Sequence, residues 1–207
     1  MNTRQTVVIS LAVSLMVAGC SHQAPRPVAQ LARQPPATQQ YSDMPVGPGA
    51  ADAHTVQQQP APGSCHYLNA SNWQALPDPN CTPGAVDPAV RADNVVDTIC
   101  RDDYAASVRP PAEITDPEED ADARAYGYNG PLDDAEYDHL IPIELGGDPN
   151  DPRNLWVEPG PASPKDTVQR QLHALVCSDK VALTDAQIAI AADWTTALAS
   201  VGFPNGN

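Results

Sequence analysis

The sequence predicts a small α+β domain that is mostly helical, contains one short β-hairpin and is stabilised by disulfides. Three observations predict it. The centre of the chain reads as strand, loop, strand and helix, a second helical pattern follows, and four cysteines lie behind an export signal. The domain is expected at residues 64–207, a length that can form one hydrophobic core.

Residues 1–20 predict the export signal. Arg4 precedes an apolar run from about Val7 to Val17, which is too short to span a bilayer as a permanent helix. The run ends in Val-Ala-Gly-Cys, which resembles the lipobox of bacterial lipoproteins, so Cys20 is expected to become the lipid-modified N-terminus. The alternative is an ordinary secretory signal with an incidental cysteine. With lipidation, acyl chains anchor the protein to a membrane.

Residues 21–63 predict a disordered tether between the membrane and the domain. They are rich in Pro, Gln and Ala, so they bury too little apolar surface to offset the entropy of ordering. The expected location is the cell envelope, at the outer membrane or the periplasmic face in a cell with two membranes. Ser21 favours the outer location, because the aspartate often linked to inner-membrane retention is absent there.

Four cysteines follow the lipidation site: Cys65, Cys81, Cys100 and Cys177. Four cysteines allow three pairings, and the sequence alone does not choose among them. We favour Cys65–Cys81 as a local loop and Cys100–Cys177 as a long-range staple. The alternative is a zinc site that combines these cysteines with His66, although no C-x-x-C pair occurs.

The composition is strongly acidic, with 26 Asp and Glu against 11 Lys and Arg and a net charge of −15. Affinity for nucleic acid comes largely from neutralised phosphates. The composition therefore argues against a domain that holds a polyanion through a strong overall field. The acidic run at residues 116–122 is predicted to be a solvated loop.

The first half of the domain predicts loops and short helices. Residues 64–88 are rich in turn formers and predict a loop that is pinned by a disulfide. Asp87, followed by proline, suits the start of a helix that ends near residue 100. Residues 104–111 predict an extended segment that ends at two prolines, and residues 121–126 predict a short helix.

The second half predicts two strands and two helices. Alternating side chains predict a strand at 137–143, and a second strand is predicted at 154–157. Ser163 suits the N-cap of a helix that runs to about residue 177. A last helix is predicted at 184–202, where a Thr-x-x-Gln capping box begins the helical pattern.

Asp138 and His139 are two titratable residues within the first predicted strand. Adjacent strand residues point to opposite faces, so the two side chains cannot serve as interchangeable ligands. A carboxylate can hold a divalent cation, and an imidazole can take a proton from water near neutral pH. The N-terminus of the following helix favours an anion. Together these groups suit the hydrolysis of a phosphodiester.

The sequence around this pair resembles the HNH endonuclease family, which has the ββα-metal fold. The resemblance is carried by YDHLIP (137–142), ELGG (144–147) and NLW (154–156). A bacterial exported subgroup resembles the chain more widely, over most of residues 80–200. Its further similar segments are TPGAVDPAV (82–90), TIC (98–100), VRPP (108–111), Tyr126-Gly127, Leu172-His173 with Val176-Cys177, and AQIAIAADW (186–194).

The resemblance implies a role for three residues. His139 would be the general base, and the alternative is a core histidine whose hydrogen bonds are satisfied by the backbone. Asp138 would bind a divalent metal ion, with Mg²⁺ expected first and Mn²⁺, Zn²⁺ or Ca²⁺ as alternatives. Asn154 would brace the hairpin and orient the loop. The implied substrate is nucleic acid, expected to be DNA, with low sequence specificity.

The third motif of the family fits less closely. Relatives often carry Asn before Pro-Lys-Asp and Glu-Asn further along the helix, where this chain has Ser163 and then Gln169-Arg170. Asp166, Gln169 and His173 lie on one side of the predicted helix and are candidates for a second ligand. We favour Asp166, with an N-terminal capping carboxylate as the equal alternative.

Lys165, Arg153 and Arg109 are the nearest cationic candidates for contact with substrate, and a solvated surface position is the alternative for each. Arg170 is a further candidate for contact with phosphate. The first functional hypothesis is an exported, lipid-anchored, metal-dependent HNH-type nuclease. The second is an envelope module that keeps the ββα scaffold for binding but has lost efficient catalysis. A third is storage of calcium or zinc by the acidic segments.

Overall fold

The computed structural model describes residues 44–50, 54–68, 74–160 and 163–204, which all belong to one compact unit that spans Pro35–Asn207. The predicted signal, Cys20 and the tether as far as residue 43 lie outside the described residues. In the part of the chain that is described, no helix has the length and apolar character needed to cross a membrane.

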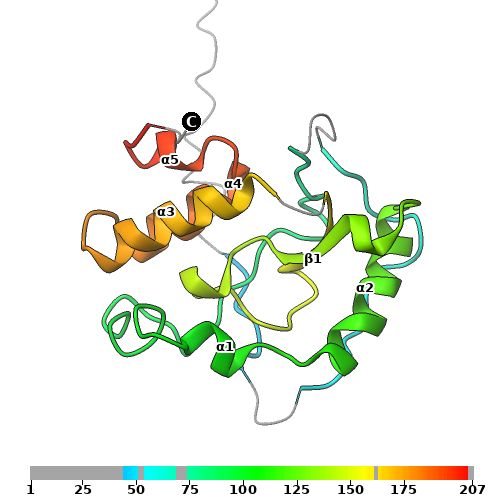
Figure 1. Cartoon of the computed structure of the whole chain (residues 1–207), viewed down its shortest axis with the longest axis horizontal. Helices are drawn as coiled ribbons and strands as arrows, with labels where there is room; N and C mark the ends of the chain where they lie inside the picture. The colour runs from blue at the N-terminus through cyan, green and yellow to red at the C-terminus, as the bar shows by residue number, and fades with distance from the viewer. Residues whose placement is uncertain (1–43, 51–53, 69–73, 161–162, 205–207) are drawn as a thin grey trace, which may run out of the picture. The chain divides into compact units, whose positions relative to one another are not determined.

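The domain is α+β, as predicted. Figure 1 shows β1 between α2 on one side and the group α3, α4 and α5 on the other. The elements in chain order, with η for a short 3-10 helix, are α1 (Tyr104–Val108), α2 (Ala112–Tyr126), η2 (Leu132–Asp134), β1 (Ala135–His139), η3 (Ile143–Leu145), β2 (Leu155–Pro159), α3 (Lys165–Cys177), α4 (Leu183–Asp193) and α5 (Ala197–Ser200).

The two strands form an antiparallel hairpin. Their register pairs Glu136 with Glu158 and His139 with Leu155. β1 begins and ends earlier than the predicted strand at 137–143. The chain leaves the ladder after His139 because Pro142 has no N–H to donate and leads directly into η3.

Helix α3 follows the hairpin and completes the order strand, strand, helix. The helix begins close to the residue predicted from the Ser163 cap. The Ser163 Oγ accepts a hydrogen bond from the Lys165 N–H at 3.0 Å, as an N-terminal capping side chain does. The helix buries Leu172 and Val176 against the core. The last helix was predicted as one element but forms two, α4 and α5. Trp194 stands at the break, where its buried Nε1 donates to the Ala75 carbonyl at 2.8 Å.

The acidic run is part of helix α2, so the prediction of a solvated loop was wrong. Glu118 and Asp122 lie one turn apart, and both side chains are buried. Their carboxyl oxygens accept backbone hydrogen bonds from Gln57 at 2.6 Å and from Val157 at 2.7 Å. These carboxyl groups therefore fasten the helix to its neighbours instead of facing water.

Two further local predictions were wrong. Residues 88–100 form successive turns and no helix. The side chain of Asn94 accepts from the Arg91 N–H and donates to the Ala89 carbonyl, which competes with helical hydrogen bonds. The segment expected to be extended contains α1, which buries Tyr104 and ends before the prolines at 110 and 111.

Part of the expected tether lies along the domain. Val46 forms a bridge with Val86, and the Gly49 N–H donates to the Asp148 carboxylate at 2.7 Å. The Gln57 N–H likewise donates a hydrogen bond to a carboxylate, that of Glu118 on α2. Residues 44–50 and 54–63 therefore belong to the folded unit, and the boundary predicted at residue 63 differs from the structure.

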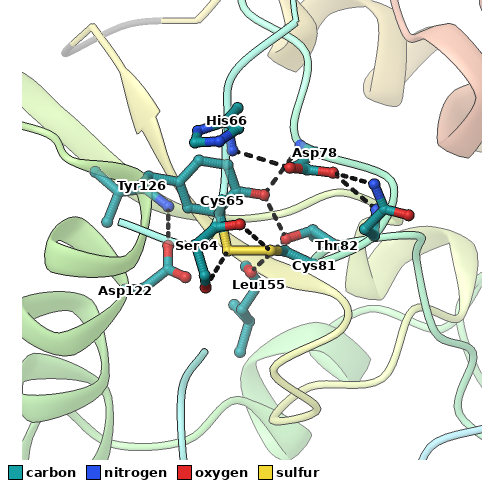
Figure 2. The surroundings of a disulfide bond; sticks show 11 residues. Ser64, Cys65, His66, Asp78, Cys81, Thr82, Asp122, Tyr126 and Leu155 are labelled. Atoms are coloured by element: carbon teal, nitrogen blue, oxygen red, sulfur yellow. Dashed lines mark hydrogen bonds between the residues drawn. A yellow bond between two sulfur atoms is a disulfide. The ribbon is translucent and has the colours of Figure 1, made fainter. Parts of the chain in front are cut away.

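Both favoured disulfides are present, Cys65–Cys81 and Cys100–Cys177. Figure 2 shows the first of them beside a small polar network, in which the Tyr126 hydroxyl pairs with the Thr82 hydroxyl at 2.7 Å. All four cysteines of the described domain are thus oxidised. The zinc site with His66 is not formed, and the backbone N–H of that residue donates to the Asp78 carboxylate.

Candidate metal and catalytic site

The loop between β1 and β2 is organised by Asn154, which is fully buried. Its Oδ1 accepts from the Ile141 N–H at 2.9 Å, and its Nδ2 donates to the carbonyls of Ile141 and Asp148, both at 3.0 Å. Gly147 passes so close that an added Cβ would overlap the Ile141 carbonyl oxygen. One side chain therefore ties the start of the loop to its middle, next to the end of β1.

His139 is the last residue of β1, and only 6% of its surface is exposed. Its Nε2 lies 3.0 Å from the Pro149 carbonyl oxygen. A carbonyl can only accept, so Nε2 carries the hydrogen and Nδ1 carries the lone pair. Burial is the main cause that lowers the pKa of His139 to about 4, and the Pro149 hydrogen bond opposes it. The imidazole is therefore neutral at pH 7, in the form that a general base requires.

Asp138 has an internal counter-ion. Its Oδ2 accepts a hydrogen bond from the Lys165 Nζ at 2.6 Å, and the same ammonium donates to the His139 carbonyl at 2.7 Å. The Lys165 side chain is 1% exposed and that of Asp138 is 15% exposed. Lys165 was expected on the surface as a phosphate contact. The structure instead places it beneath the hairpin, paired with the predicted metal ligand.

Glu158 is a functional candidate that the sequence analysis missed. It lies on β2 with 1% exposure, and its Oε1 accepts from the Ser163 hydroxyl. Its Oε2 is buried without a hydrogen-bond partner in the described structure. Burial, followed by the nearby charge of Asp138, raises the pKa of Glu158 to about 8. Glu158 lies one residue beyond the strand predicted at 154–157, and only the hairpin register places it on the same face as Asp138.

The oxygen groups beside the hairpin fit a hard divalent cation. Asp138 and Glu158 supply carboxylates, and Ser163 supplies a hydroxyl. Mg²⁺, Mn²⁺ and Ca²⁺ prefer such oxygen donors. The unpartnered Oε2 of Glu158 is a further fit, because a buried carboxyl oxygen without a donor favours a bound cation.

The favoured second ligand, Asp166, lies in the first turn of α3. The Gln169 side chain donates a hydrogen bond to the Asp166 Oδ1 at 3.4 Å. Burial, followed by the charge of Asp166, raises the pKa of Glu136. The Asp166 side chain is half-buried, on the Glu136 side of the helix start. His173, the other helix candidate, lies farther along, and its Nε2 is 2.9 Å from the Ile99 carbonyl.

Arg153 and Arg170 do not converge on the Asp138 carboxylate. Arg153 forms an ion pair with Asp151 and donates to the Val46 carbonyl at 3.2 Å. Arg170 is exposed on α3 and donates to the Thr167 hydroxyl at 3.1 Å. The structure therefore gives neither arginine a contact with Asp138 or His139.

A cavity of about 640 Å³ lies between α1 and η3, close to the loop that follows His139. His139 is not among the residues that line this cavity. Charged and aromatic side chains of the cavity wall are Arg101, Asp102, Asp103, Tyr104, Arg109, Glu144 and His173.

A second group of side chains could hold a metal ion. The ligand atoms of Cys100, His173 and Cys177 lie within 4.8 Å of one another. The two sulfurs are joined in the disulfide, however, and metal ligation needs free thiolates. This group is therefore a structural staple in its oxidised form, and it is separate from the oxygen donors beside the hairpin.

Comparisons of the chain with known protein families, curated proteins and solved structures found no match.

Proposed function

We propose that the chain is a metal-dependent HNH-type endonuclease that hydrolyses DNA phosphodiester bonds. The observation that carries the proposal is the environment of His139. This residue ends the first strand of a hairpin that is followed by a helix, its Nε2 is bound to a backbone carbonyl, and the adjacent loop is held by Asn154. Such an arrangement holds a neutral imidazole in a fixed orientation at the end of β1.

In this proposal the Nδ1 of His139 removes a proton from the attacking water. The Pro149 carbonyl fixes the ring orientation and stabilises the imidazolium that forms, because the Nε2 hydrogen becomes more acidic. The low pKa of about 4 favours a neutral base, and the negative phosphate of a substrate would raise that pKa toward neutrality. The His139 side chain thereby gains proton affinity when substrate is present.

Asp138 and Glu158 are the residues that would hold a divalent cation, which when bound supplies charge stabilisation to the scissile phosphate. The Arg101 and Arg109 side chains line the cavity and are available to neighbouring phosphates. Few cations surround the site, so contacts with substrate phosphates are few. Contacts with the sugar–phosphate backbone of the nucleic acid carry no sequence information. The expected activity is therefore DNA cleavage with low sequence specificity, weakened by salt.

A second function is favoured by one observation, the ion pair of Lys165 with Asp138. A carboxylate that keeps this ammonium would not take a metal ion, and the domain would then be an envelope module that binds without efficient catalysis. The export signal and lipid anchor at Cys20 belong to both functions.

A plasmid-nicking assay separates the two functions. The purified protein is tested with Mg²⁺, with Mn²⁺ and with a chelator, and compared with His139→Ala. An exposed histidine away from the hairpin provides the matched control, His66→Ala. Metal-dependent nicking that only His139→Ala abolishes supports the nuclease. Nicking by neither protein with any ion supports the binding module.

A further inference from the structure

We infer that Glu158 and Asp138 together form the cation site of this protein, and that the Lys165 ammonium occupies this site until a divalent cation displaces it. The inference rests on the proposed function, and it names a second ligand on β2 in place of the expected one on α3. It also assigns to Lys165 the role of an internal competitor for the metal ion.

The hairpin register places the two carboxylates on the same face. Glu158 pairs with Glu136, two residues before Asp138 on β1. Side chains two residues apart on a strand point to the same side, and diagonal neighbours across a hairpin are within contact distance. Two carboxylates at this separation repel one another unless a cation or a proton lies between them.

Glu158 provides the observation that distinguishes this pair from an ordinary acidic cluster. The residue is almost fully buried, and its Oε1 is held by the Ser163 hydroxyl. Its Oε2 has no donor among the described residues. Burial of a carboxyl oxygen without a partner is costly, so a native protein rarely keeps one without a ligand or a functional reason.

Lys165 already occupies a cation position. Its Nζ lies 2.6 Å from a carboxylate oxygen of Asp138 and 2.7 Å from the His139 carbonyl oxygen. A carboxylate and a backbone carbonyl are also the ligand types that hard divalent cations take. The ammonium is a single charge on a flexible four-carbon stem, so it can withdraw when a doubly charged ion binds the same oxygens. Removal of the ammonium should therefore strengthen metal binding.

Isothermal titration calorimetry with MnCl₂, in the absence of DNA, tests the inference on the full-length protein. We expect one Mn²⁺ site in the wild type. Glu158→Gln should weaken binding about tenfold or more, because a charged ligand is lost. Lys165→Met should tighten binding about tenfold, because a competing charge is lost. Asp166→Asn should change the Kd less than about twofold, and the exposed Glu113→Gln on α2 is the matched control for the glutamate substitution.

Circular dichroism and urea unfolding establish that each variant is folded, and Lys165→Gln replaces Lys165→Met if the latter does not fold. Wild-type affinity in Glu158→Gln, or a large loss in Asp166→Asn alone, would overturn the inference and leave the proposed nuclease intact. Weaker binding in both Lys165 variants would overturn the competitor role. No Mn²⁺ binding by the wild type would overturn the inference together with the metal requirement of the proposed function.

Discussion

Replacement of Asn154 by alanine tests the account of how the site is positioned. The substitution leaves four backbone groups without their partner, namely the N–H groups of Ala85 and Ile141 and the carbonyls of Ile141 and Asp148. All three of those residues are fully buried. At about 1 kcal/mol for each lost hydrogen bond, the free energy of unfolding should fall by about 4 kcal/mol.

Urea denaturation at pH 7 measures this loss, and Asn150→Ala is the matched control. Asn150 is a buried asparagine of the same loop whose Nδ2 donates one hydrogen bond, to the Thr55 carbonyl at 2.9 Å. Its replacement should cost about 1 kcal/mol. Equal losses in the two variants would refute the view that Asn154 organises the loop.

Three further substitutions test other parts of the structure. Serine at both Cys100 and Cys177 opens a loop of sequence separation 77 and should lower the free energy of unfolding by about 4.5 kcal/mol, measured in urea; an unchanged urea midpoint would contradict this. Gly147→Ala should lower the free energy of unfolding by about 3 kcal/mol, because the added Cβ would overlap the backbone. Gly127→Ala, whose added Cβ meets no atom within 4 Å, should lower it by about 1 kcal/mol. Burial raises the pKa of Asp122 to about 7, so the folded state keeps a proton that the unfolded state loses, and stability should fall by about 3 kcal/mol as pH rises from 4 to 7. Asp122→Asn should remove that part of the pH dependence in urea titrations, and an identical slope in both proteins would count against it.

The centre of the domain was predictable from the sequence because its signals are local. Alternating side chains, the turn-forming loop and the Ser163 cap produce a hairpin and a helix near the expected residues. The favoured disulfides were also found. β1 begins two residues and ends four residues earlier than predicted, and β2 begins one residue and ends two residues later than predicted. Beyond the end of β1, Pro142 has no N–H and the Ile141 N–H is bound by the Asn154 side chain, so the ladder stops there.

Other parts depend on long-range contacts that a sequence pattern does not contain. Glu118 and Asp122 look like a solvated charge run until backbone amides far away in the sequence bind them. The sequence suggests that Lys165 is a surface cation, but its side chain is buried and paired with Asp138 of β1. Glu158 became a candidate only once the register placed it on the same face as Asp138. For Glu118, Asp122 and Lys165, tertiary burial reversed the expectation of a solvated charge.

Chemical rescue of His139→Ala tests the central claim most directly. The variant should lose plasmid nicking in Mn²⁺ by a factor of about 10² or more, the usual contribution of a general base. Added imidazole should restore nicking with saturation in this variant, and it should leave the wild type and His66→Ala unchanged. A His139→Ala protein that nicks plasmid at the wild-type rate without imidazole would contradict the account.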